Sequence, residues 1–456
     1  MKTKAVPITE ISEIRRILCP PNLDRSELLA SRRQGSPELK VEQEVRAMKS
    51  VTFHCGKCKV NTCGIENDPG ASVRHCPGCN SILMLCPVCH KATSGTEKFK
   101  ILICDSCHTE FVTDTTVQSL IDMDRKSRQV VLSGIRATNR LHLGNFLGAI
   151  RQFVQYSTGD NLCLYFIADW HTLTTCQDAA TVTGNSVEIA MNYIAAGLDP
   201  ERSIIYAQSS VPEIAELALY LSMIQDKGEL EVLPTLKDLL RGGANMNLGH
   251  LSYPVLMAAD ILGPKATLVP VGSDQIPNVE LARRLAKKFN RRFGQTFVIP
   301  EIGEQKVKIP GLGGGKMAKS DESSCIFIDD AAEVVAKKYA KHGVTDKNKV
   351  KRDDSGVPEN CASIYPVYQV LLGEESSLLQ EVANGCRVGS RTCQECKAEL
   401  AKMVNSILEP VRVKRRELGG KREFVREVLH FGGLKAREII RPTLELVREK
   451  LGIIAP

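Results

Sequence analysis

The sequence predicts an α/β protein with a doubly wound parallel sheet in the middle of the chain, an α-helical region after it and a small cysteine-rich domain before it. Short apolar runs alternate with longer helical segments from about residue 128, four CxxC pairs lie before residue 115, and the last sixty residues are helical and basic. With 456 residues, 43% hydrophobic and 25% charged, the chain has room for about three domains and lies outside the disordered, collagenous and membrane classes.

Residues 1–50 are expected to form a short helix and a linker. This segment has neither the apolar core nor the small-residue cleavage site of a secretory signal, and Glu10 and Glu13 argue against a transit peptide. No apolar run of the sequence approaches the roughly 18 residues that cross a bilayer. We therefore expect a cytoplasmic location, where CxxC pairs indicate metal or redox sites before disulfides.

Residues 51–115 are expected to form a tandem zinc-ribbon-like module. Seventeen residues separate the first and second CxxC pairs and fourteen separate the third and fourth, which suits two hairpins that each close a tetrahedral site of four thiolates. The predicted ligands of two structural zinc ions are Cys55, Cys58, Cys76, Cys79, Cys86, Cys89, Cys104 and Cys107. The alternatives are a cross-braced pairing, a redox CxxC pair, or a histidine ligand from His54, His75, His90 and His108.

Residues 128–325 carry the strand–helix alternation of a parallel sheet. Strands are expected at 130–134, 162–169, 203–208 and 266–272. Helices are expected at 141–156, 179–196, 213–224, 253–262 and 277–290. Ligands of such sheets bind beyond the carboxyl ends of the strands, so the loops there are the first place to search for a site.

Two loops of this region carry phosphate-binding chemistry. The segment His142–Asn145 opens a helix directly after a glycine-terminated strand, where free backbone N–H groups and the helix dipole favour an anion. Taken alone, however, those four residues favour a simple helix start, with His142 as a polar neighbour of the cap. The second loop, GLGGGKMAKS at 311–320, presents Lys316 and Lys319. It is not a Walker loop, because Pro310 and Met317 occupy positions that need glycine and Ser/Thr, and no GxGxxG follows the first strand.

Together the two loops resemble the HIGH and KMSKS signatures of class I aminoacyl-tRNA synthetases. SGIRATNRLHLGN, FIADWHTLTT, SYPVLMAADIL, VPVGSDQ and KMAKS occur in the order seen in tryptophanyl-tRNA synthetases, from about Val130 to the C-terminus. The resemblance implies a Rossmann-like catalytic domain over 128–325 and a helical anticodon-binding region over 326–456. Ala318, Arg136 and the GSDQ serine depart from the family, the last toward the tyrosyl enzymes. A tyrosyl-type synthetase and a non-catalytic synthetase-like regulator that binds nucleic acid are the alternatives.

The resemblance implies tryptophan activation by ATP with Mg²⁺, followed by transfer to tRNA(Trp), in a homodimer. The catalytic residues it implies are His142, Asn145, Lys316 and Lys319. The implied ATP-binding residues are Arg136, Ala137, Thr138, Gly144, Asn145, Gly272, Ser273, Asp274, Ile309, Lys316, Met317, Ala318, Lys319 and Ser320. For tryptophan they are Tyr253 and Gln275 at the ammonium group, Met257 on the ring and Asp260 at the indole N–H.

A second cysteine group and a basic run follow in residues 326–456. The cysteines have the spacing C-x24-C-x6-C-x2-C, and resemble those of bacterial tryptophanyl enzymes with a 4Fe–4S cluster, although spacing alone favours zinc. The ligands would be Cys361, Cys386, Cys393 and Cys396. Residues 397–456 hold 14 basic and 8 acidic residues, most of the chain's net charge of +7, and the resemblance makes this a surface on the anticodon side of the tRNA.

Overall fold

The computed structural model contains two compact units, Met1–Thr113 and Asp114–Pro456. It describes residues 50–54, 61–65, 73–75, 81–85, 92–98, 101–106, 110–111, 129–138, 140–241, 247–304, 309–315, 317 and 322–454. The helix expected within 1–50 and seven of the eight N-terminal CxxC cysteines lie outside the described residues. The eighth, Cys104, ends a strand.

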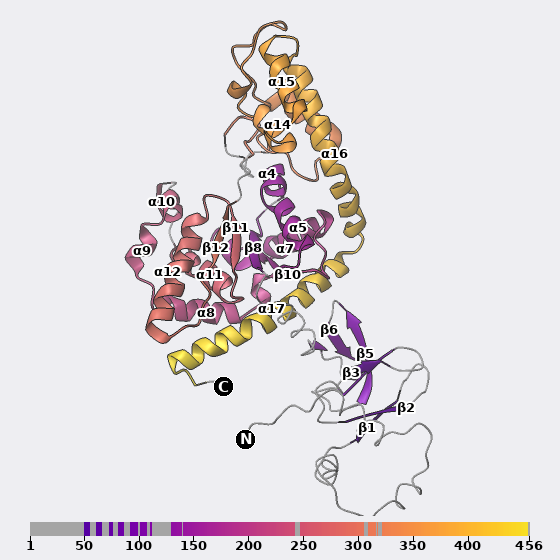
Figure 1. The fold of residues 1–456 in the computed structure, drawn as a ribbon, viewed down its shortest axis with the longest axis vertical. Coiled ribbons are helices and arrows are strands. Elements are labelled where there is room, and N and C mark those ends of the chain that lie inside the picture. The colour runs from indigo at the N-terminus through magenta and orange to yellow at the C-terminus, as the bar shows by residue number, and fades with distance from the viewer. Residues whose placement is uncertain are drawn as a thin grey trace, which may run out of the picture. The chain divides into compact units, whose positions relative to one another are not determined.

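The first unit is built from short antiparallel strands (Figure 1). Strand β1 (Ser50–His54) pairs with β2 (Asn61–Ile65). A five-stranded sheet follows in sequence order, formed by β3 (Val73–His75), β4 (Ile82–Leu85), β5 (Ala92–Lys98), β6 (Ile101–Cys104) and β7 (Glu110–Phe111). Hairpins of this kind are what the ribbon prediction requires of the backbone.

The second unit contains the predicted parallel sheet, with strand order β10-β9-β8-β11-β12. Its strands are β8 (Val130–Arg136), β9 (Leu162–Ala168), β10 (Ser203–Ala207), β11 (Leu268–Val271) and β12 (Glu301–Glu304). Every residue of β9 is buried, as expected of a central strand covered on both faces. Strand β12 was not predicted, because its sequence EIGE has no apolar run.

Helices cover both faces of this sheet (Figure 1). They are α4 (Leu143–Asn145), the π-helix η2 (Phe146–Ile150), α5 (Arg151–Thr158), α6 (Asp169–Thr172), α7 (Ala179–Ala195), the 3-10 turn η3 (Gln208–Ser210), α8 (Glu213–Ser222), α9 (Lys227–Glu231), α10 (Pro234–Arg241), α11 (Leu248–Leu262) and α12 (Ile276–Phe293). One hydrophobic core joins the sheet to α8, α11 and α12, with Leu164, Ala258 and Phe289 fully buried.

The C-terminal region is helical, as predicted. It contains α13 (Ala332–His342), η4 (Pro358–Asn360), α14 (Tyr365–Leu372), α15 (Ser377–Arg387), α16 (Cys393–Gly419) and α17 (Arg422–Leu451). Thr392 caps α16 in a capping box with Glu395, which fixes where that helix begins. Among the described residues, no helix is both long and apolar enough to cross a membrane.

Helix α17 packs on the edge strand β10 at a pair of glycines. A Cβ at Gly432 would overlap the carbonyl oxygen of Ile205, and one at Gly433 would overlap the hydroxyl of Ser210. The helix backbone therefore touches the strand backbone directly. On the same helix, Arg437 pairs with Glu213 at 3.0 Å, which helps to fix α17 against α8.

Candidate active site

A cavity of about 800 Å³ opens at the carboxyl ends of β8, β9 and β11. This is the position at which doubly wound sheets bind ligands. The sequence-predicted residues that line it are Arg136, Thr138, Asn145, Tyr253, Met257, Gly272, Asp274 and Gln275. Residues proposed for the nucleotide and residues proposed for tryptophan therefore share one cavity.

Seven other predicted residues that the structure describes do not line the cavity. These are Ala137, His142, Gly144, Ser273, Asp260, Ile309 and Met317. Ala137, Asp260 and Met317 are buried. The remaining predicted residues, Lys316, Ala318, Lys319 and Ser320, lie outside the described residues.

His142 and Asn145 cap the helix that opens with α4. The backbone N–H of Asn145 donates to His142 Nδ1 at 3.2 Å, and the backbone N–H of His142 donates to Asn145 Oδ1 at 3.2 Å. This reciprocal capping box fixes both side chains at the helix start, beside the positive end of the helix dipole. Asn145 also lines the cavity, so the cap forms part of the cavity wall.

The chain that follows the KMAKS loop pairs with the HLGN segment. The N–H of Leu143 donates to the carbonyl of Ile326 at 2.7 Å, and the N–H of Ile328 donates to the carbonyl of Leu141 at 3.0 Å. The structure thus brings segments almost 200 residues apart into contact. A β-carbon at Gly144 would lie 3.8 Å from Ile309 Cβ, so the chain before the glycine-rich loop also lies here.

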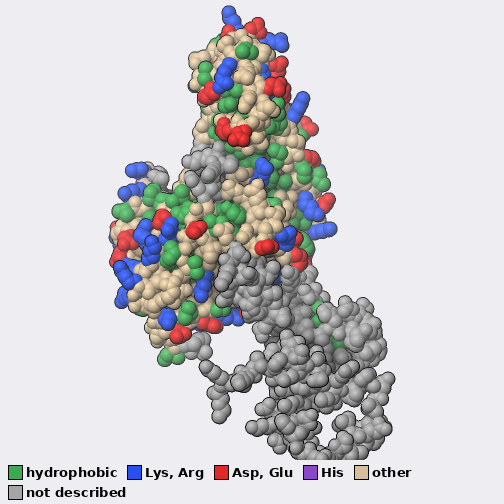
Figure 2. Space-filling model, in the orientation of Figure 1, with side chains coloured by type: hydrophobic (Ala, Val, Ile, Leu, Met, Phe, Trp, Pro, Cys, Tyr) green, Lys and Arg blue, Asp and Glu red, His purple; other side chains and the backbone are tan. Residues whose placement is uncertain are grey.

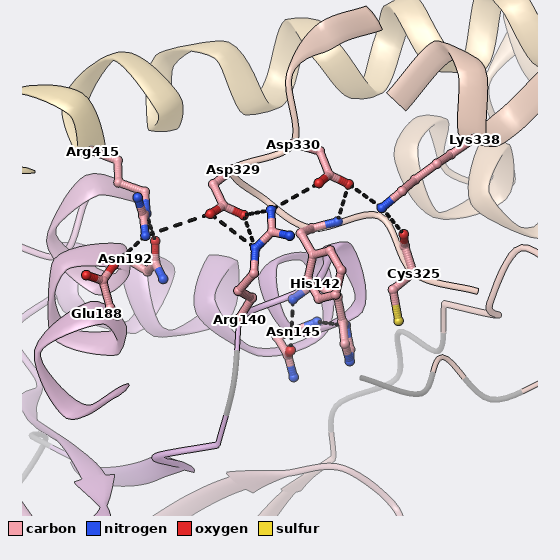
Figure 3. Close-up of polar contacts among 11 residues, drawn as sticks. Arg140, His142, Asn145, Glu188, Asn192, Cys325, Asp329, Asp330, Lys338 and Arg415 are labelled. Carbon is pink, nitrogen blue, oxygen red and sulfur yellow. Dashed lines mark hydrogen bonds and ion pairs between the residues drawn. The ribbon is translucent and has the colours of Figure 1, made fainter. Parts of the chain in front are cut away.

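A charged network holds this pairing in place (Figure 3). Arg140 donates to Asp329 at 2.6 Å and to Asp330 at 3.0 Å. Asp330 accepts from Lys338 Nζ at 2.7 Å and from the N–H of Phe327 at 2.9 Å. Because Asp330 is only 6% exposed, its two cationic partners and the backbone N–H compensate for burying its charge.

Asp260 is 2% exposed and accepts three hydrogen bonds within the protein. Its Oδ2 lies 3.0 Å from His171 Nε2, and both carboxylate oxygens accept from Gln208 Nε2 at 2.9 Å. Burial raises the pKa of Asp260, and the bonds from His171 and Gln208 oppose that shift. His171 lines the cavity and packs edge-on against Tyr253 with ring centroids 6.0 Å apart, so it connects the carboxylate to the cavity.

Arg136 brings a cation into the cavity wall. Its Nη2 donates to Thr175 Oγ1 at 2.6 Å and to Thr174 Oγ1 at 3.3 Å, and both of these partners are neutral hydroxyl groups. Burial lowers the pKa of Arg136, which nevertheless stays charged at neutral pH because an arginine titrates so far above it. A partly buried guanidinium of this kind is suited to a phosphate or carboxylate ligand.

Sequence reasoning missed several residues of the site. His171 and Gln208 position Asp260, and Thr235 and His250 line the cavity. A signal for two of them existed, because His171 stands within the DWH motif and Gln208 directly follows strand β10. The hydroxyl oxygen of Thr235 is buried without a hydrogen-bond partner among the described residues, and no sequence pattern marks it.

The four C-terminal cysteines line a second, small cavity together with Lys349 and Arg391. They are Cys361, Cys386, Cys393 and Cys396. Arg391 Nε donates to the sulfur of Cys396 at 3.1 Å. Burial, with smaller contributions from the three neighbouring thiols, raises the pKa of Cys361 to about 11. Among the described residues no His, Cys, Asp and Glu group of three or more has metal-binding geometry.

The glycine-rich arm of the KMAKS loop contacts the chain beside Cys361. The N–H of Val344 donates to the carbonyl of Leu312 at 3.1 Å. A Cβ at Gly314, whose φ is +88°, would lie 2.5 Å from Ala362 Cβ. The loop that carries Lys316 therefore begins on a surface made by the cysteine segment.

Residues 124–409 match the family of class I tRNA synthetases for tryptophan and tyrosine. The tryptophan–tRNA ligases of Aquifex aeolicus and Thermotoga maritima are 34% and 38% identical to this chain, and each alignment covers 71% of it and 99% of the relative. The solved structure of tryptophanyl-tRNA synthetase from Campylobacter jejuni, complexed with ADP and tryptophan, is 34% identical, covers 71% of this chain and 99% of its own, and has a TM-score of 0.62.

The three alignments cover 99% of each relative, and the ordered motifs and the parallel sheet both lie within the matched residues 124–409. Residues 1–113 form a unit that precedes the matched region. The chain belongs to the tryptophanyl-tRNA synthetases of class I.

Proposed function

We propose that this tryptophan–tRNA ligase forms tryptophanyl-adenylate in the cavity at the carboxyl ends of β8, β9 and β11. One observation carries the proposal: residues proposed for ATP, such as Arg136 and Asn145, and residues proposed for tryptophan, such as Tyr253 and Met257, line the same cavity of about 800 Å³. That volume lies within the range of small-ligand sites.

In the first step an oxygen of the tryptophan carboxylate attacks the α-phosphorus of ATP. The bond from that phosphorus to the bridging oxygen of the β-phosphate breaks, and pyrophosphate leaves with the electron pair. Bound Mg²⁺ would neutralise phosphate charge. The chain's own contribution is positioning and charge stabilisation, from Arg136, from the N–H groups at the capped start of α4, and from Lys316 and Lys319. The aminoacyl group then passes to the 3′ adenosine of tRNA(Trp).

Selection of tryptophan rests on Asp260. A carboxylate offers about four acceptor positions, and three hydrogen bonds from His171 and Gln208 leave one for the indole N–H. The indole N–H is the polar group that distinguishes tryptophan from other large apolar side chains. Met257 and Tyr253, which line the cavity, would pack on the ring and hold the ammonium group.

The test is ATP–pyrophosphate exchange measured with each amino acid. Exchange that depends on tryptophan and not on tyrosine supports the assignment. Exchange with tyrosine alone would refute it, and no exchange with either would favour a non-catalytic role.

We also propose that Cys361, Cys386, Cys393 and Cys396 hold a 4Fe–4S cluster. The four thiols share one cavity, the raised pKa of Cys361 is what a bound metal would offset, and Arg391 supplies an N–H bond to sulfur of the kind that tunes such clusters. Anaerobic purification followed by iron, sulfide and zinc analysis tests this. Cys386→Ser should remove the iron, whereas Cys325→Ser, at a buried cysteine outside this cavity, should keep it. Zinc in place of iron overturns the proposal.

The eight N-terminal CxxC cysteines are proposed to bind two structural zinc ions. The antiparallel strands of residues 50–111 support this proposal. We expect two equivalents of zinc in the full-length protein, and we expect them to be absent after residues 1–113 are deleted. We further propose that the enzyme is cytoplasmic and that it forms a homodimer. Sedimentation can test the homodimer.

A further inference from the structure

Most cations of the basic run of the C-terminal region are paired with acidic side chains. The run consists of Arg412, Lys414, Arg415, Arg416, Lys421 and Arg422. Five of its six cations form ion pairs: Arg412 and Arg416 with Glu409, Lys414 with Glu417, and Arg415 and Arg422 with Glu188. On α17 the arginines Arg437 and Arg448 are paired with Glu213 and Glu216. Three of these carboxylates, Glu188, Glu213 and Glu216, come from the catalytic domain and offset about half of the surplus of positive charge in residues 397–456.

Helix α12 shows the opposite pattern. It carries six basic residues and a single acidic one, Glu280. Arg283 pairs with Glu280 and Lys288 with Asp226. Four others are exposed and have no acidic partner among the described residues: Arg284, Lys287, Arg291 and Arg292. The guanidinium of Arg292 lies over the ring of Phe293, which leaves Arg284, Lys287 and Arg291 without such a contact. Figure 2 shows basic side chains gathered over the part of the catalytic domain where Figure 1 labels α9, α10 and α12.

These three side chains form one stripe along the helix, which we call the α12 stripe. Their spacing of three and four residues places them on the same helical face. The opposite face is buried, with Leu285, Ala286 and Phe289 at most 1% exposed. The stripe therefore points to solvent because the apolar face of α12 fixes the rotation of the helix.

The stripe begins close to the active site. Helix α12 starts at Ile276, directly after Asp274 and Gln275, which line the cavity. At 1.5 Å per residue, Arg284 lies about 12 Å along the axis from that start and Arg291 about 22 Å. A polyanion lying along the stripe would thus have one end beside the cavity.

We propose that the α12 stripe binds the sugar–phosphate backbone of the tRNA arm that carries the 3′ end. The proposal rests on the ligase function proposed above, which requires the 3′ adenosine to enter the cavity. Unpaired arginine and lysine side chains bind phosphates without reading bases, and they hold a strand in position. The stripe would act in docking the tRNA, and it has no part in adenylate formation.

The test removes three charges from the full-length protein with Arg284→Gln, Lys287→Gln and Arg291→Gln. We expect the slope of log Kd for tRNA(Trp) against log salt to fall by about 2 to 3 units, and the KM for tRNA in aminoacylation to rise about tenfold. ATP–pyrophosphate exchange needs no tRNA and should persist. The matched control is a pair of single variants. Lys287→Gln removes an unpaired cation of the stripe, whereas Lys227→Gln removes a cation that is paired with Glu231 on α9 and should change the slope by less.

The outcomes separate the two proposals. Absence of tryptophan-dependent exchange in the unmodified protein refutes the ligase assignment. If exchange is normal but the salt slope of the α12 variant is unchanged, only the proposal for the stripe is overturned. An equal reduction of the salt slope in the control has the same consequence.

A second measurement does not depend on the folding of the variant. In the unmodified protein, bound tRNA should protect the exposed Lys287 from an amine-acylating reagent. A Lys287 that reacts equally in both states overturns the proposal. A Lys287 that is unreactive without tRNA would also overturn the proposal, because the stripe would then be covered by another part of the protein.

Discussion

Replacing Gly432 by alanine should weaken both the fold and the selection of tryptophan. The added methyl group would overlap the carbonyl oxygen of Ile205 on β10. Helix α17 would have to move away from the strand, although the ion pair between Arg437 and Glu213 holds it nearby. The strand leads into η3, where Gln208 donates to both oxygens of Asp260, so the displacement should reach the tryptophan carboxylate.

The size of the effect follows from two opposing contributions. Glycine to alanine inside a helix is favourable by about 1 kcal/mol, because alanine loses less backbone entropy. Forcing a methyl group into a filled contact costs about 1–3 kcal/mol, and here the obstacle is backbone that cannot change rotamer. The net result is a loss of up to about 2 kcal/mol. For a chain of this size that corresponds to a fall in Tm of a few degrees.

Gly184→Ala is the matched control. Gly184 lies within α7, and a Cβ there would meet nothing within 4 Å. The same substitution should therefore stabilise the protein slightly at this position, by up to about 1 kcal/mol. Thermal unfolding and the KM for tryptophan in ATP–pyrophosphate exchange should be measured for both variants. Equal shifts of Tm in the same direction, or an unchanged KM in Gly432→Ala, would refute the reasoning.

Three further results are expected. Asp260→Asn places N–H donors opposite the N–H donors of Gln208, so the KM for tryptophan should rise about 10–100-fold while the KM for ATP changes little. An unchanged KM for tryptophan in the exchange assay would contradict the role of Asp260. Arg136→Gln removes the guanidinium of the cavity wall, and exchange assays should show a KM for ATP about tenfold higher than that of the unmodified protein. A KM for ATP equal to that of the unmodified protein would exclude a contact between Arg136 and phosphate. The hydrogen bond from Arg448 lowers the pKa of Glu216, so the stability that this pair contributes is present above the usual pKa of 4.5 and is lost as the pH falls through the lowered value. Urea midpoints between about pH 5 and 3 should therefore fall less in Arg448→Gln than in the unmodified protein, and parallel curves would disprove the linkage.

The parallel sheet could be predicted because its strands have a simple signature. Strand β9 is buried along its whole length, so its seven residues are apolar without alternation, and the helices between strands carry their own periodicity. Strand β12 could not be found in this way. It lies at the edge of the sheet and reads EIGE, so its pairing with β11 is decided by tertiary contacts and not by composition.

The site was predictable where it lies in contiguous motifs and not where it depends on distant partners. Asp260 was identified from its motif, but the hydrogen bond to Gln208 joins residues 52 positions apart. The net charge of the C-terminal surface likewise could not be judged from the sequence, because it depends on distant partners. A count along the sequence registers Arg415 and Arg422 as free cations, whereas Glu188, from a helix of the catalytic domain, forms ion pairs with both.

The contact between α17 and β10 has a consequence for how the protein is made. Strand β10 is an edge of the sheet, and the helix that packs on it through Gly432 is translated more than two hundred residues later. While the ribosome is still synthesising the C-terminal region, the growing chain has a sheet whose edge near Ile205 is uncovered, and open edges pair readily with other strands. Chains that stop before residue 432 keep that edge exposed. The last helix therefore ends the period in which the new enzyme is prone to aggregate.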